Sequence, residues 1–221
     1  MSNQVVLRPL RFTADVPAMR RFLETLGLKS RVESEHGGWV DMVAGRGMVA
    51  LHDSASSATG AKSGETGLSF EADDIEELKE RLQAAGYEDA TVWDEAYGRV
   101  LSVTVTGDAV IWVDQRSDDL YGYKLHDAKP DERLSVTPVL QVADQPAWQH
   151  FLEALGGDSA QLVSYEPGTG DLGVRLGFST TELLTEVELR LTAAGYQPAL
   201  TEHSLTVEDP DGQPVTVRLQ S

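Results

Sequence analysis

The chain has 221 residues and carries 18 lysines and arginines against 36 aspartates and glutamates, a formal net charge of −18. Acidic residues exceed basic ones both in residues 1–115 and in residues 116–221. Neither half therefore offers the positively charged surface that binding to nucleic acid or to an anionic membrane requires. No cysteine is present, which excludes disulfides, thiolate zinc sites and cysteine nucleophiles. Without a basic, apolar leader or a long apolar run, the sequence predicts a cytoplasmic globular protein that binds neither nucleic acid nor membrane.

The sequence repeats itself at two offsets. Residues 15–27, from Asp15 to Gly27, return at 144–156 with an offset of 129, and residues 82–87 return at 191–196 with an offset of 109. The order is therefore A-B-A′-B′, and the A′ segment is twenty residues shorter than A, enough to lose one hairpin.

Each repeat is centred on an amphipathic helix that begins near an aspartate or a proline and ends near a glycine. Asp15 and Asp144 are the predicted N-caps of the first and third helices. Short β-rich runs flank every helix, and we predict strands at 5–13, 38–43, 48–52, 67–72, 100–106, 109–114, 135–143, 161–165, 172–178, 204–208 and 215–219. One apolar stripe per helix implies that each helix covers one face of a sheet.

These elements resemble the vicinal oxygen chelate superfamily, which includes glyoxalase I, extradiol dioxygenases and bleomycin-resistance proteins. The resemblance is carried by residues 15–27, by Gly67-Leu68-Ser69-Phe70-Glu71-Ala72-Asp73-Asp74, by Tyr97-Gly98-Arg99 and by Asp209-Pro210-Asp211-Gly212. It implies an α+β fold of tandem βαβββ modules in two paired-module halves, the second shortened. The expected domains are 1–115, a linker at 116–133, and 134–221.

Metal-dependent members of that superfamily place His, Gln or Glu on the first and last strands of paired modules. When the motifs of this sequence are aligned with those of the superfamily, the metal-ligand positions are occupied by Arg8, Gly67, Trp112, Thr137 and Thr216. None of them is a metal ligand, and an arginine would repel a cation. We therefore expect no metal, no cofactor and no catalytic residue; a composite site from His52, Asp53 and Glu71 stays open as an alternative.

Aromatic residues in the strands of the first half indicate a ligand cleft instead. We predict that Trp39, Trp93 and Trp112 line it, with His52, Tyr97 and Arg99 near its mouth. The resemblance implies a metal-free, bleomycin-resistance-like protein that binds a small molecule, such as an antibiotic or a metabolite, without turnover. The tryptophans and the net charge of −18 favour an aromatic or cationic ligand. Two alternatives stay open: a metal-dependent lyase, isomerase or dioxygenase with atypical ligands, and a non-catalytic scaffold or dimerisation module. The expected assembly is a monomer with an internal pseudo-dimer, or a homodimer.

Overall fold

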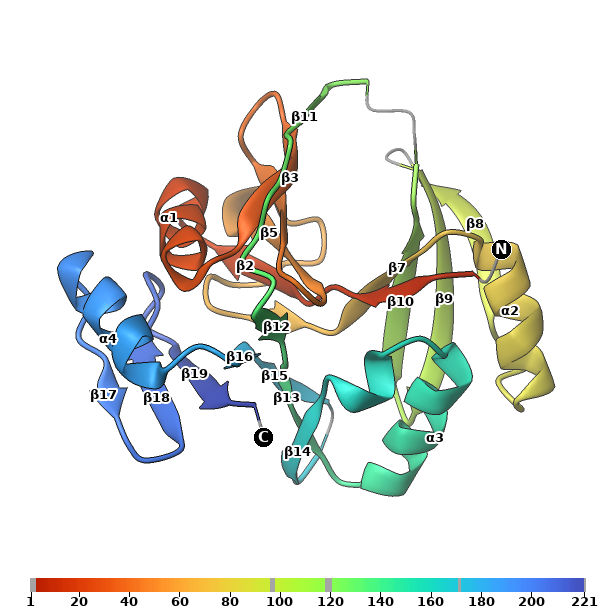
Figure 1. Cartoon of the computed structure of the whole chain (residues 1–221). Coiled ribbons are helices and arrows are strands. Elements are labelled where there is room, and N and C mark those ends of the chain that lie inside the picture. Colours follow the sequence, from red (N-terminus) through yellow and green to blue (C-terminus); the bar gives the residue numbers. More distant parts are fainter. Residues whose placement is uncertain (1–2, 96–97, 118–120, 171, 221) are drawn as a thin grey trace. The chain divides into compact units, whose positions relative to one another are not determined.

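The computed structural model describes residues 3–95, 98–117, 121–170 and 172–220 (Figure 1). Its residues form two compact units, and each unit combines segments from both halves of the sequence. Unit 1 holds the described residues of 1–8, 68–119 and 139–174, and unit 2 holds those of 9–67, 120–138 and 175–221. The predicted domains 1–115 and 134–221 describe the two copies of the sequence repeat. They do not coincide with the two units, because each unit contains segments of both copies. No helix in the described residues has the length and apolar character that a membrane crossing requires.

Unit 1 is built on a five-stranded sheet in the order β1-β7-β10-β9-β8, with a small sheet in the order β14-β13-β15. Helices α2 and α3 pack with these strands around one buried apolar cluster that includes Phe70, Leu101, Val113 and Phe151. The elements are β1 (Val5–Leu7), β7 (Ser69–Ala72), α2 (Ile75–Ala84), β8 (Thr91–Glu95), β9 (Gly98–Thr106), β10 (Ala109–Gln115), β13 (Val139–Val142), α3 (Gln145–Leu155), a 3-10 turn (Ser159–Gln161), β14 (Ser164–Pro167) and β15 (Gly173–Arg175).

Unit 2 contains a six-stranded sheet in the order β11-β3-β4-β5-β2-β6 and a five-stranded sheet in the order β12-β16-β19-β18-β17. Helices α1 and α4 share its core, which includes Phe22, Leu51, Phe178 and Val217. The elements are β2 (Leu10–Thr13), α1 (Val16–Leu26), β3 (Lys29–Ser34), β4 (Trp39–Val43), β5 (Met48–Asp53), a 3-10 turn (Ser54–Ser56), β6 (Thr66–Gly67), β11 (Tyr123–Leu125), β12 (Leu134–Val136), β16 (Gly177–Thr180), α4 (Leu184–Ala193), β17 (Ala199–Leu200), β18 (Ser204–Glu208) and β19 (Pro214–Leu219).

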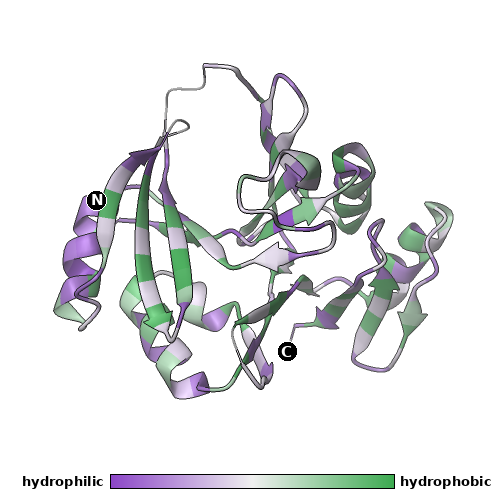
Figure 2. Ribbon diagram, turned by 180° about the vertical axis from the view of Figure 1, so that it is seen from behind, coloured by the Kyte–Doolittle hydropathy of each residue, from purple (hydrophilic) through white to green (hydrophobic). Residues whose placement is uncertain are grey.

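The strands show the alternation that places one face of a sheet against helices. Figure 2 shows hydrophobic and hydrophilic residues alternating along the strands. On β10, Ile111 and Val113 are buried, whereas the alternate residues Val110 and Trp112 are 45% and 40% exposed. Period-two alternation therefore divides this sheet into a helix-covered face and an open face.

The predicted helix caps are confirmed. The side chains of Asp15 and Asp144 each accept a hydrogen bond from a backbone N–H in the first turn, at 2.8 Å from Ala18 and 3.0 Å from Ala147. Helix α4 differs, because Leu183 occupies the cap position and provides no side-chain acceptor. Its repeat counterpart in α2, Asp74, accepts two such bonds.

The repeat predicted from the two offsets is visible in the topology. The order β1-β7-β10-β9-β8 in unit 1 matches the order β12-β16-β19-β18-β17 in unit 2, with the same parallel and antiparallel pairings along the described strands. The order β14-β13-β15 matches β5-β2-β6, and β13 pairs with β14 in parallel as β2 does with β5. The missing pair is the counterpart of β3 and β4, so the predicted loss of a hairpin after the third helix is confirmed.

Several predicted strand boundaries were wrong. The strand predicted at 5–13 is two strands, because the chain leaves one sheet after Leu7 and enters another at Leu10. The strand predicted from Gln161 begins only at Ser164, after a 3-10 turn. Strand β3, polar at most positions, has no clear alternation and was not predicted, and neither was β11 within the expected linker 116–133.

Candidate functional site

The open face of the unit 1 sheet is the face opposite α2, and we define it by Trp93, Val110 and Trp112. Trp93 on β8 pairs with Val100 of β9, and Trp112 on β10 pairs with Ser102 of β9, so both indoles project to the same side. Their ring centroids are 5.3 Å apart with an interplanar angle of 63°. Trp93 is 38% exposed and Trp112 is 40% exposed. Large exposed aromatic side chains that touch one another are typical of a surface that binds a ligand or a partner.

A buried charge network lies on the same face of this sheet. Arg8 follows β1 and is 4% exposed, and its Nη2 forms an ion pair with Asp114 of β10. Its Nη1 lies 3.8 Å from Oε2 of Glu71, which is also 4% exposed. Arg116 Nε donates to the other oxygen of Glu71 at 2.8 Å. Arg116 Nη1 also binds Asp73 at 2.7 Å, so the two arginines pair with three carboxylates. Each of the buried groups, Arg8 and Glu71, thus has a partner of opposite charge, as charges in a protein interior require.

This network does not fit a metal ion. The guanidinium of Arg8 stands where the superfamily pattern requires a first-strand ligand, and the carboxylates nearest to it are already bound to Arg8 and Arg116. Trp112 offers an indole, and Gly67 has no side chain. Within the described ranges, no three His, Asp or Glu residues lie close enough together to hold a metal ion, and this includes His52, Asp53 and Glu71. The donor chemistry is that of an ion-pair network.

Trp39 and His52 form a second aromatic site, in unit 2. They lie opposite each other on β4 and β5, with centroids 5.5 Å apart and rings perpendicular. Phe12 of β2 lies 5.5 Å from the same imidazole on its other side. His52 Nδ1 is 2.7 Å from the carbonyl oxygen of Asp53, so a proton on Nδ1 donates to that oxygen and leaves Nε2 as the basic nitrogen.

The predicted site residues therefore fall into two pairs, one in each unit. Trp93 contacts Trp112, and Trp39 contacts His52. Arg99 lies on the helix-covered face of the unit 1 sheet, where Nη2 binds Glu76 of α2 at 2.5 Å. Tyr97 lies outside the described residues. That one cleft is lined by all of these residues stays a prediction.

Sequence reasoning missed the partners of Arg8. It placed Arg8 at a metal-ligand position of the superfamily pattern, and it placed neither Asp114 nor Arg116 in a site. One residue in the sequence could have indicated such a network. Glu71 lies in the strand Ser69–Ala72, where it is buried, and a buried carboxylate implies a cationic partner.

Comparison with known proteins shows the fold. No family model and no curated protein sequence matches this chain. Among solved structures, it resembles a catechol 2,3-dioxygenase with 12% identity and a TM-score of 0.64, covering 98% of this chain and 92% of that one. It also resembles the Mn(II)-bound glyoxalase from Novosphingobium aromaticivorans, with 13% identity and a TM-score of 0.62, over 97% of this chain and 80% of that one. A third is homoprotocatechuate 2,3-dioxygenase from Arthrobacter globiformis, with 15% identity and a TM-score of 0.59, over 97% of this chain and 78% of that one.

Proposed function

With the vicinal oxygen chelate fold as the premise, we propose that this chain binds a small aromatic or cationic molecule on the open face of unit 1, without a metal and without turnover. The observation that carries the proposal is the position of Arg8. Its guanidinium, bound to Asp114 and close to Glu71, replaces a ligand where metal-dependent members need one. The glyoxalase and dioxygenases with this fold share too little sequence to transfer their activities.

The chemistry of the open face favours a planar ligand. Two half-exposed indoles offer stacking surface, and each aromatic contact contributes about 0.5–1.5 kcal/mol beyond the burial of area. A cation over an indole face adds about 0.5–2 kcal/mol. The net charge of −18 favours the approach of cations and makes the association rate depend on salt. A planar aromatic cation combines these terms, and it is the ligand class that we propose.

The direct experiment is calorimetric titration with N-methylquinolinium, a planar cation, and with 1-methylnaphthalene as its neutral counterpart. We expect saturable binding of the cation, and we expect Trp112→Ala to weaken it by about tenfold, the equivalent of about 1.4 kcal/mol. Trp39→Ala, which alters the aromatic pair of unit 2, tests separately whether Trp39 contributes to the same ligand site, as the sequence predicts. Equal affinity in the parent protein and in Trp112→Ala would place any site elsewhere.

The alternative of a metal-dependent lyase, isomerase or dioxygenase is tested in the same preparation. We expect the melting temperature to stay unchanged when Mn²⁺ or Fe²⁺ is added and when chelator is added. A ligand that binds only the native protein raises its stability by mass action, so one tightly bound ion per chain would shift the melting temperature. Such a shift, abolished by Asp114→Asn, would overturn the metal-free proposal.

A further inference from the structure

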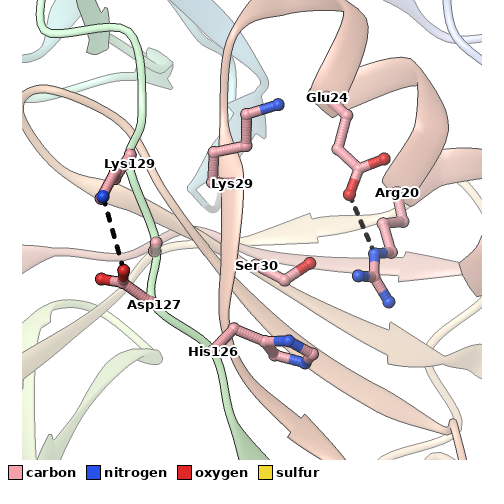
Figure 3. Close-up of a pocket in the computed structure, with 8 residues that line it drawn as sticks. Arg20, Glu24, Lys29, Ser30, His126, Asp127 and Lys129 are labelled. Atoms are coloured by element: carbon pink, nitrogen blue, oxygen red, sulfur yellow. Dashed lines mark hydrogen bonds and ion pairs between the residues drawn. The ribbon is translucent and has the colours of Figure 1, made fainter.

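A hollow of about 300 Å³ lies in unit 2 beside α1. Its lining includes Arg20 of α1, Lys29 and Ser30 of β3, and His126 and Lys129 of the segment after β11 (Figure 3). Ser30 pairs with Met42 of β4, which is buried under α1. Trp39 points to the other face of that strand, so the hollow and the Trp39–His52 pair lie on opposite faces of one sheet.

The hydroxyl of Ser30 is the unusual group in this hollow. Ser30 is 6% exposed, and among the residues that the structure describes its Oγ has no hydrogen-bond partner. Figure 3 shows this oxygen on the side of the hollow that also holds Arg20 and His126. A buried hydroxyl without a partner is costly, so it indicates a group that binds there and accepts its hydrogen bond.

The charges around Ser30 favour an anion as that group. Three lysine and arginine side chains line the hollow against two carboxylates, although the whole chain carries −18. Arg20 is bound to Glu24 at 3.1 Å, and Lys129 to Asp127 at 3.6 Å. Lys29 is exposed, and no ion pair to it occurs within the described part of the chain. Its ammonium group is therefore the cation available to a ligand.

His126 is held at the same place by a third carboxylate. Its Nε2 lies 3.0 Å from Oε2 of Glu33, and Arg20 Nη1 donates to the same oxygen at 3.0 Å. Burial alone would raise the pKa of Glu33, but the hydrogen bonds and charges of His126 and Arg20 outweigh it and hold that pKa below its usual range. Glu33 is thus already neutralised by its partners, which reduces its repulsion of an anion in the hollow.

We propose that this hollow binds a small oxyanion, a phosphate or a carboxylate, through the ammonium group of Lys29 and the hydroxyl of Ser30. Donation from a charged and a neutral group to one oxyanion is the arrangement that gives short, strong hydrogen bonds. The site is built from residues of unit 2 and uses none of the residues that define the open face of unit 1, so it does not rest on the aromatic binding function proposed above. It would recognise an anionic ligand or the anionic end of a larger one.

The test is a titration with inorganic phosphate and, separately, with acetate, followed by the ¹H–¹⁵N spectrum at fixed ionic strength, with sodium chloride as the reference. We expect saturable shifts of the Lys29, Ser30 and His126 amides with at least one of the two anions, and the stronger binder identifies the oxyanion class. Lys29→Gln should weaken binding about tenfold, as expected for losing a charged donor. Lys62→Gln, with the same change of charge elsewhere in unit 2, should leave the affinity unchanged.

Ser30→Ala separates a binding role from a purely structural one. Without anion, the variant should melt at the same or a higher temperature than the parent, because a buried hydroxyl without a partner is removed. With phosphate or acetate, it should bind about tenfold more weakly than the parent. Affinity equal to the parent in Ser30→Ala would overturn the proposal, as would equal weakening in Lys29→Gln and Lys62→Gln, or shifts that sodium chloride reproduces.

Discussion

Replacing Arg11 by methionine should be among the most destabilising single changes in unit 2. The Arg11 side chain is 2% exposed and forms an ion pair with Asp209, whose side chain is 0% exposed. Arg11 Nε lies 3.5 Å from Asp211, and Nη1 donates to the carbonyl oxygen of Gly64 at 2.5 Å and to Thr66 at 3.0 Å. One guanidinium thus joins β2 to the turn at 209–212 and to the segment before β6.

The expected loss in the free energy of unfolding depends on the groups that Arg11→Met leaves without a partner. Methionine fills the space of the arginine stem, but it leaves the carboxylate of Asp209 buried and without a counter-charge. Breaking a buried ion pair from one side typically costs about 3–5 kcal/mol. An exposed pair contributes about 1 kcal/mol or less, so Arg20→Met, which removes half-exposed pairs with Glu24 and Glu33, is the matched control.

Urea denaturation followed by circular dichroism measures the free energy of unfolding, and the single variant Asp209→Asn and the double variant Arg11→Met/Asp209→Asn complete the double-mutant cycle. Asparagine keeps the side-chain oxygen that accepts from the backbone N–H groups of Asp211 and Gln213, both at 2.9 Å. The double variant should therefore be more stable than Arg11→Met alone.

The pH dependence of Arg11→Met has a defined sign. Burial raises the pKa of Asp209, and the charge of Arg11 opposes that effect. Without Arg11, the pKa of the folded carboxyl should rise further above its unfolded value. A raised carboxyl pKa stabilises the fold below the unfolded pKa, and this stabilisation is lost as pH rises through the folded pKa. Arg11→Met should therefore be closest to the parent in acid. A loss no larger than that of Arg20→Met, or a double variant no better than the single one, would refute the reasoning.

Three further outcomes are expected. Leu183→Asp should raise the melting temperature by supplying the cap that Asp74 provides in α2, worth about 0.5–2 kcal/mol; an unchanged temperature would contradict the capping argument. Trp148→Ala should cost about 3–5 kcal/mol in urea denaturation, because this indole is 2% exposed in the core of unit 1. Hydrogen bonds from Arg133 lower the pKa of Asp131 despite its partial burial, so its contribution to stability is present above the unfolded pKa and is lost as pH falls through the folded value. Asp131→Asn should flatten the acid side of the stability profile, and a profile identical to the parent would show that the carboxylate contributes nothing.

The sequence by itself was sufficient for the helices and for the repeat. Helix stripes, the caps Asp15 and Asp144, and the glycines after the helices are local signals that act within one or two turns. Gly86 and Gly195 illustrate this, since they are equivalent in the repeat and both adopt positive φ, at 100° and 91°. The offsets of 129 and 109 differ by twenty residues, which is the length of one hairpin, and this was enough to predict its loss. A hairpin can be lost without disturbing the fold, because the strands on either side of it still pair in parallel, as β13 and β14 do.

Tertiary structure decided how strands are shared and which charges meet. Val5–Leu7 and Leu10–Thr13 are separated by only two residues, yet they belong to different sheets, and only long-range pairing determines that division. Arg8 and Arg11 are three residues apart and look alike in the sequence, yet one binds Asp114 in unit 1 and the other binds Asp209 in unit 2. Partners separated by 106 and 198 positions leave no local pattern. A buried arginine is stable only where the fold supplies a carboxylate, so the role of each was decided by the fold and not by its neighbours in the chain.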